Sequence, residues 1–124
     1  MARMVLVADD DVDVREAVVD VLVEAGYAVE VAADGREALT RLNTGPPPEV
    51  LVVDSSLREE TALALLRACR GGDIAALLLT SGDEPPDWAR ARHPLLRKPF
   101  SGEALLRAVA RTIRERAARQ STES

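Results

Sequence analysis

The chain has 124 residues, 47% apolar and only 2% aromatic, which predicts one domain whose core is built from Val, Leu, Ala and Ile. Its formal net charge of -5 disfavours direct nucleic-acid binding, which needs a basic surface, so the arginines from Arg107 to Arg119 are interpreted as a solvated helix face. No apolar run is long enough to cross a membrane, and the single cysteine, Cys69, excludes a disulfide framework and predicts a cytoplasmic protein.

The sequence contains five short apolar runs that are separated by amphipathic stretches. The third run is uninterrupted, which is typical of a strand buried on both faces of a parallel sheet. Each run has the length of a strand rather than that of a buried helix. The predicted strands are residues 4–8, 27–32, 50–53, 76–79 and 95–97.

Helices are predicted between the strands. Val14, Val18 and Leu22 recur at helical spacing before Gly26, a residue type that commonly ends helices. Ser101 is the predicted N-cap of the final helix. The domain is expected to cover residues 1–120, followed by a polar tail at 121–124. The predicted helices are residues 14–25, 36–42 and 61–70, a short one near 87–91 and a long one after Ser101.

Polar side chains follow four of the five predicted strands. Strands that alternate with helices form an α/β fold with a parallel sheet and helices on both faces. In such folds ligands bind at the carboxyl ends of the strands. Asp9 and Asp10 follow the first strand, Asp54 the third, Thr80 the fourth and Lys98 the fifth. The sequence therefore predicts that these five residues converge on one site.

The three carboxylates of this set indicate a metal ion. Asp9, Asp10 and Asp54 would repel one another in a single cleft unless a cation were present. Hard carboxylate oxygens without His or Cys nearby favour Mg²⁺. The cation would in turn screen a phosphoryl group, whose transfer depends on positioning and charge neutralisation. A carboxylate can act as the nucleophile and form an acyl phosphate.

Lys98 is the only lysine among the sixteen Lys and Arg residues of the chain. Arginine presents a planar fork, whereas lysine is a compact point charge on a flexible stem. We infer that an ammonium is required at this position, where it would hold a phosphoryl oxygen. Thr80 would donate a hydroxyl hydrogen bond to another oxygen of the same group.

Four segments in this order, residues 5–11, 51–54, 77–82 and 96–100, make the chain resemble response-regulator receiver domains from end to end. The resemblance implies a flavodoxin-like doubly wound sheet of five parallel strands, (βα)5, in the order 2-1-3-4-5. It also implies a phosphoprotein of a two-component phosphorelay rather than an enzyme with an external substrate. A histidine kinase or phosphotransfer protein would be the phosphoryl donor, and the downstream protein target stays unknown.

The same resemblance assigns a role to each site residue. Asp54 matches the phosphoacceptor. Asp10 matches the direct Mg²⁺ ligand beside Asp54, and Asp9 matches the acid that usually holds the ion through water. The backbone carbonyl of Ser56 matches the third protein ligand. The list is completed by Thr80, which matches the switch hydroxyl, and Lys98, which matches the phosphate-binding lysine.

Three positions depart from the family pattern. Arg58 and Ala62 stand where a Pro and a Gly are common, which predicts a less rigid loop after Asp54. Leu95 stands where the family places a Tyr or Phe whose ring rotates on phosphorylation, so transmission by ring rotation is not expected. Leu95 itself is interpreted as a core residue. The segment between Thr80 and Lys98 is also short, which predicts a shortened fourth helix.

Two alternative functions stay open on the sequence. One is a pseudo-receiver, a protein-interaction module that keeps the fold without the chemistry. The other is a small phosphatase of the haloacid-dehalogenase type, although Asp13 stands where that class has Thr or Val and no paired acids follow a late strand. The resemblance also leaves weak homodimerisation open, with no membrane partner expected.

Overall fold

The computed structural model describes residues 3–55, 57–81 and 94–123. Five parallel strands form one sheet in the order β2-β1-β3-β4-β5, which confirms the predicted topology. The strands are β1 (Met4–Ala8), β2 (Ala28–Ala32), β3 (Val50–Asp54), β4 (Ala75–Thr80) and β5 (Leu95–Arg97). The described helices are α1 (Val12–Glu24), α2 (Gly35–Leu42), α3 (Glu59–Gly72) and α5 (Gly102–Glu123).

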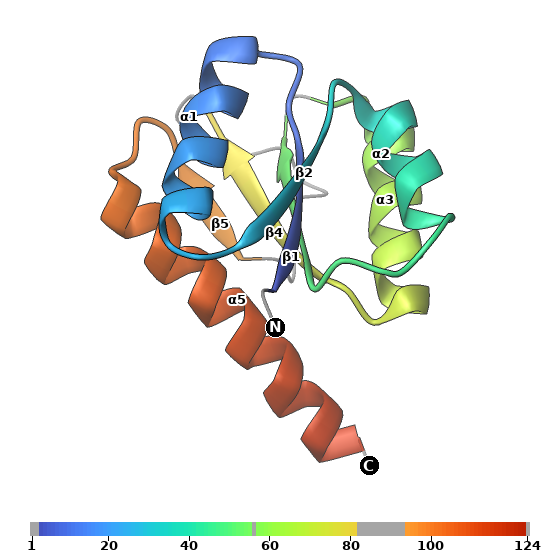
Figure 1. The fold of residues 1–124 in the computed structure, drawn as a ribbon. Coiled ribbons are helices and arrows are strands. Elements are labelled where there is room, and N and C mark those ends of the chain that lie inside the picture. Colours follow the sequence, from blue (N-terminus) through green and yellow to red (C-terminus); the bar gives the residue numbers. More distant parts are fainter. Residues whose placement is uncertain (1–2, 56, 82–93, 124) are drawn as a thin grey trace.

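The helices cover both faces of the sheet, as Figure 1 shows. Helices α1 and α5 lie on one face, while α2 and α3 lie on the other. The uninterrupted apolar sequence of the central strands follows from this arrangement, because both of their faces are buried. All five residues of β3 are buried.

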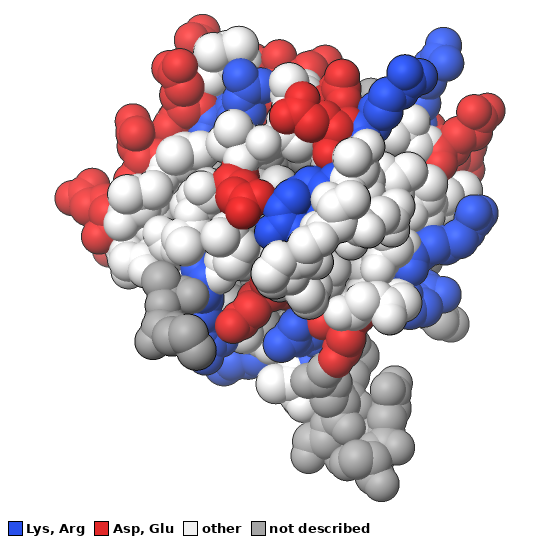
Figure 2. All heavy atoms as spheres, turned by 45° about the vertical axis from the view of Figure 1, so that its right-hand side comes forward, with Lys and Arg blue, Asp and Glu red and all other residues white. Residues whose placement is uncertain are grey.

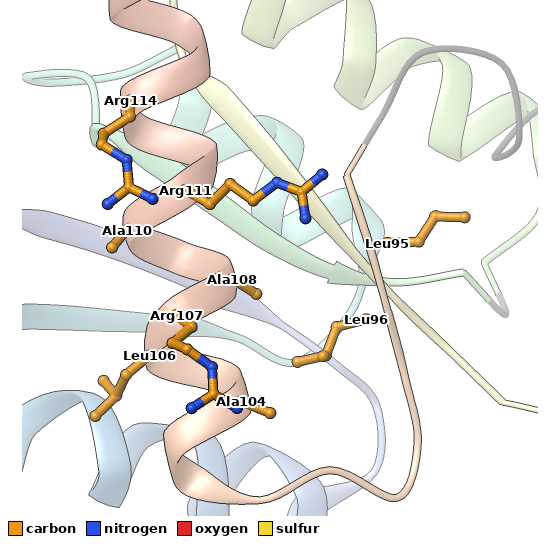
Figure 3. Close-up of a pocket in the computed structure, with 9 residues that line it drawn as sticks. All are labelled: Leu95, Leu96, Ala104, Leu106, Arg107, Ala108, Ala110, Arg111 and Arg114. Atoms are coloured by element: carbon orange, nitrogen blue, oxygen red, sulfur yellow. The ribbon is translucent and has the colours of Figure 1, made fainter.

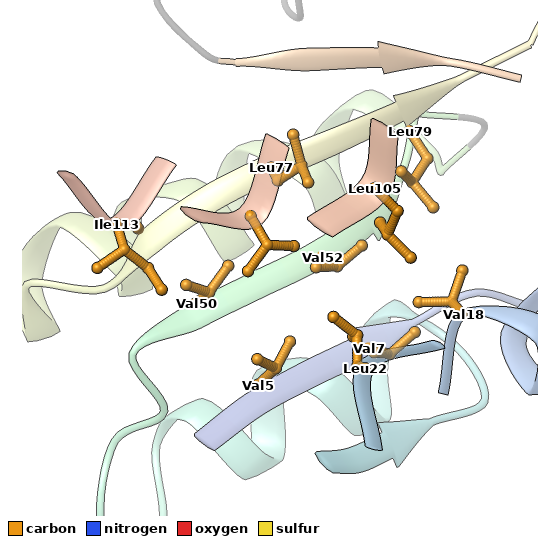
Figure 4. Close-up of a cluster of buried hydrophobic side chains, with 12 residues drawn as sticks. Val5, Val7, Val18, Leu22, Val50, Val52, Leu77, Leu79, Leu105 and Ile113 are labelled. Atoms are coloured by element: carbon orange, nitrogen blue, oxygen red, sulfur yellow. The ribbon is translucent and has the colours of Figure 1, made fainter. Parts of the chain in front are cut away.

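The larger hydrophobic cluster lies between the sheet and the α1–α5 layer (Figure 4). Alternate residues of β1, β3 and β4 point to this side, and the intervening residues point to α2 and α3. Val18 and Leu22 of α1 belong to the same cluster as Leu105 and Ile113 of α5, so the predicted helical stripes form this layer of the core. Apolar side chains therefore pack against both faces of the sheet and hold the carboxyl ends of its strands in position.

Helices α2 and α3 approach each other closely at Gly35. A Cβ atom at this position would lie 2.3 Å from Cγ2 of Thr61, far inside van der Waals contact. Glycine is therefore required at the start of α2 by the closeness of α3. The loop that leaves Asp54 is packed here as well, since Leu57 lies 3.6 Å from the same Cβ position.

The clearest differences from the predicted helices are the start of α1 and the end of α5. Helix α1 begins at Val12, two residues early, because Asp11 accepts hydrogen bonds from the amides of Asp13 and Val14. The last helix continues to Glu123, so residues 121–123, predicted as a polar tail, extend α5. No Gly or Pro follows Gly102 to end it. The short helix predicted near 87–91 lies outside the described residues.

Charge is unevenly spread over the surface. Figure 2 shows acidic side chains gathered along the upper left of the face drawn, with basic side chains more frequent at the right and below.

Among the described helices, none is long and apolar enough to span a membrane.

Candidate functional site

The parallel sheet brings the predicted site residues to one edge. Asp54 is the last residue of β3 and pairs with Leu79 of β4. Thr80 ends β4 and pairs with Arg97 of β5, directly before Lys98. Asp9 follows β1, which pairs with β3 in parallel register. The strand order, rather than closeness in sequence, is what assembles the site.

Three carboxylates lie together at this edge. Asp9, Asp10 and Asp54 each offer one oxygen, and these oxygens all lie within 4.8 Å of one another. Asp9 is only 1% exposed and Asp54 is 6% exposed, whereas Asp10 lies at the surface. The group thus has two buried acids and one that faces solvent.

Lys98 lies against the two buried carboxylates. Its Nζ atom is 2.9 Å from Oδ2 of Asp54 and 3.4 Å from Oδ2 of Asp9. Its side chain is 18% exposed. Burial acts to lower the pKa of Lys98, but hydrogen bonds and attraction from Asp54 and Asp9 outweigh it and raise the pKa. The ammonium therefore stays charged at neutral pH, and any stability it contributes is lost only in strong alkali.

Asp9 is the acid whose ionisation the site opposes. Burial raises its pKa, and the nearby charge of Asp54 raises it further. The amide of Asp11, which donates to Oδ1 of Asp9 at 2.9 Å, and the ammonium of Lys98 act in the opposite direction without cancelling the rise. The attraction of Lys98 therefore does not bring the pKa of Asp9 back to its ordinary value.

The raised pKa of Asp9 and the convergence of three carboxylates fit a divalent cation. The donor set is three carboxylates whose oxygens converge, without His or Cys among the described residues of the group, which is the chemistry that Mg²⁺ prefers. Two of these acids, Asp9 and Asp54, already approach Lys98 through their Oδ2 atoms. The residues present could therefore hold Mg²⁺ beside the ammonium.

The remaining predicted site residues are placed less fully. Thr80 is buried, and its carbonyl accepts a 2.7 Å hydrogen bond from the backbone amide of Lys98, which ties the ends of β4 and β5 together. Ser56, whose carbonyl was predicted as a metal ligand, lies outside the described residues.

One contact at the site was not predicted. The guanidinium of Arg15 donates a hydrogen bond from Nη1 to the backbone carbonyl of Asp9 at 3.0 Å. The sequence does not distinguish Arg15 from other helical arginines. A spacing of six residues from Asp9 matches no regular helix or strand contact, so it could not predict this hydrogen bond.

Leu95 is not the core residue that the sequence suggested, because it is 39% exposed. It belongs to the edge strand β5, along which Leu96 points toward α5 and Leu95 points away (Figure 3). Both residues line a shallow hollow of about 580 Å³ that also includes Arg107, Arg111 and Arg114 of α5. This hollow contains none of the carboxylates and is separate from the acidic site.

Comparisons with known proteins agree with this geometry. Residues 5–110 match the family model of the response regulator receiver domain. Response regulator MprA of Mycolicibacterium vanbaalenii is 37% identical over 112 residues, which cover 86% of this chain and 48% of that protein. MprA of Mycobacterium tuberculosis is 33% identical over a match that covers 100% of this chain and 56% of that protein. The chain thus spans about half the length of the curated relatives it matches.

Solved structures show the same fold. Chemotaxis protein CheY4 of Vibrio cholerae superposes with a TM-score of 0.76 at 30% identity, covering 90% of this chain and 99% of its own. A response regulator receiver protein of Sinorhizobium medicae has a TM-score of 0.77 at 21% identity over 93% of this chain and 97% of its own, a likeness of fold alone. With the topology and the family match in agreement, the chain belongs to the response regulator receiver domains of two-component systems.

Proposed function

We propose that this chain is cytoplasmic, accepts a phosphoryl group on Asp54 from a histidine kinase or phosphotransfer protein, and signals through the resulting change of conformation. The observation that supports this most directly is the ammonium of Lys98, which lies 2.9 Å from Oδ2 of Asp54 inside a group of three carboxylates. A buried acid with an adjacent fixed cation is suited to carrying a dianionic substituent. The domain would assist its own phosphorylation rather than turn over a separate substrate.

In the proposed step, an Asp54 carboxylate oxygen attacks phosphorus and forms a new O–P bond. The P–N bond of the donor phosphohistidine breaks, and its electron pair stays on the imidazole nitrogen. Lys98 would then pair with a phosphoryl oxygen, since the ammonium already lies beside the accepting carboxylate. The hydroxyl of Thr80, at the end of the neighbouring strand, would donate to another oxygen.

Asp9, Asp10, Asp54 and the carbonyl of Ser56 are the proposed ligands of Mg²⁺. When bound, Mg²⁺ supplies positive charge that offsets the negative charge of the phosphoryl oxygens. Asp9 and Asp10 have a second role, which is to disfavour cations that need nitrogen or sulfur ligands.

Intact mass after incubation with acetyl phosphate and Mg²⁺ tests the proposal. We expect one added phosphoryl group in the wild-type chain and none in an Asp54→Asn variant, which keeps the shape of the side chain but lacks the nucleophile. If the acyl phosphate is too short-lived to appear in the mass spectrum, beryllofluoride, which binds the aspartate in place of a phosphoryl group, would still bind an intact site and be detected by ¹⁹F NMR. If neither an adduct nor beryllofluoride binding is found, the proposal is wrong and the pseudo-receiver alternative takes its place.

Mg²⁺ should raise the melting temperature, because it binds the folded acid group and not the unfolded chain. At a hundred times its dissociation constant, the expected stabilisation is about 2.7 kcal/mol. Asp10→Ala should remove most of this gain. Asp13→Ala makes the same charge change on the first turn of α1, outside the carboxylate group, and should keep it. Equal gains in the two variants would contradict the metal assignment.

Asp9→Asn should stabilise the protein at neutral pH in a chelating buffer. The pKa of Asp9 is raised in the fold, so stability falls as pH rises from the ordinary pKa of 3.8 to the raised pKa, because only the unfolded chain ionises in this range. Above the raised pKa the loss is complete and stays constant. Asparagine resembles the protonated acid and escapes this loss. The advantage should disappear below pH 3.8, the ordinary pKa of the group, where Asp9 is protonated in both folded and unfolded chains. Melting curves at several pH values, with Asp13→Asn as the exposed control, would reveal a contrary, pH-independent effect.

A further inference from the structure

Arg15 is attached at two points to the loop that carries Asp9 and Asp10. Its Nη1 atom donates to the carbonyl of Asp9 at 3.0 Å, and its own backbone amide donates to the carbonyl of Asp11 at 2.9 Å. The residue is half-buried in the second turn of α1. It therefore spans the loop from the end of β1 to the start of α1.

Three residues connect β1 to α1, and the first of them is still tied to the sheet because the amide of Asp9 donates to the carbonyl of Ala32 in β2 at 3.4 Å. The last β1 residue in the sheet ladder is Ala8, so the carbonyl of Asp9 lies beyond the parallel pairing with β3. A hydrogen bond from a charged guanidinium is stronger than one between neutral groups. With Oδ1 of Asp9 accepting the amide of Asp11 and its carbonyl held by Arg15, Oδ2 is the atom that approaches Lys98.

We propose that Arg15 is a positioning residue for the acidic site. It fixes the backbone of Asp9 so that the carboxylates of Asp9 and Asp10 face Asp54, and it acts on the bound cation through this backbone rather than by touching it. The proposal rests on the proposed function in one respect, since the cation it serves is the Mg²⁺ assigned there.

Charge and positioning make opposite predictions for the loss of Arg15. Removing a cation from the neighbourhood of a carboxylate group strengthens the attraction for Mg²⁺ by Coulomb's law. Loosening the loop instead weakens Mg²⁺ binding, because the ligands must be ordered when the ion binds. The sign of the change in affinity therefore separates the two effects.

The experiment is a calorimetric titration of Mg²⁺ into wild type, Arg15→Met, Arg15→Lys and Arg67→Met. Arg67 is an exposed residue of α3, so its replacement makes the same charge change away from the site. We expect Arg15→Met to weaken binding about tenfold, the low end for loss of a group that orients metal ligands. Arg15→Lys keeps one donor and should recover part of the affinity, and Arg67→Met should equal wild type.

Amide hydrogen exchange of residues 9–11, measured by NMR without metal, gives a second readout that does not depend on Mg²⁺. Arg15→Met should speed exchange in this loop while exchange in β1 and β3 stays unchanged. Tighter or unchanged Mg²⁺ binding, or unchanged loop exchange, would overturn the proposal. Failure of wild type to bind Mg²⁺ would instead count against the proposed function, and loop exchange would still decide the role of Arg15.

Discussion

The attraction between the ammonium of Lys98 and the buried carboxylates of Asp9 and Asp54 is the interaction on which the site depends. Asp9 and Asp54 are almost fully buried, and an isolated charge in that position would be strongly disfavoured. Lys98 approaches both of them, at 3.4 Å and 2.9 Å, yet the pKa of Asp9 is still raised. Burial and the charge of Asp54 therefore outweigh the attraction of Lys98 at Asp9. This opposition costs stability in the metal-free protein, and under the proposed function a bound cation would offset it while Lys98 would pair with a phosphoryl oxygen.

The sheet makes this arrangement possible. Asp9, Asp54, Thr80 and Lys98 come from four strand ends that are far apart in the sequence, and the order β2-β1-β3-β4-β5 places those ends side by side. Two apolar layers, from α1 with α5 and from α2 with α3, hold the strands rigidly below the site. The hydrogen bond from the amide of Lys98 to the carbonyl of Thr80 and the one from Arg15 to Asp9 carry that rigidity into the loops. The proposed site therefore lies at the carboxyl edge of the sheet.

The sequence was sufficient for the fold because its periodicity is simple. Apolar runs such as 50–53 and 4–8 have one structural solution in a chain that alternates strands with amphipathic helices. The convergence of Asp9, Asp54 and Lys98 followed from the rule that strand ends share an edge. Sequence could not show the exposure of Leu95, which depends on β5 being an edge strand with alternating faces. Nor could it show that Arg15 reaches a backbone carbonyl, because no side-chain pattern marks a carbonyl as an acceptor. The continuation of α5 to Glu123 was missed because polar residues were interpreted as a tail although nothing there breaks a helix.

The most direct measurement is a double-mutant cycle between Lys98 and Asp54, with free energies of unfolding from urea titrations at neutral pH without divalent cations. Lys98→Met removes the ammonium, Asp54→Asn removes the acceptor's charge, and the double variant removes both. Because the pair is largely buried, we expect Lys98→Met to cost at least about 1 kcal/mol more in the wild-type background than in Asp54→Asn. Additivity within about 0.5 kcal/mol would show that the ammonium does not stabilise the Asp54 carboxylate, and would contradict the account.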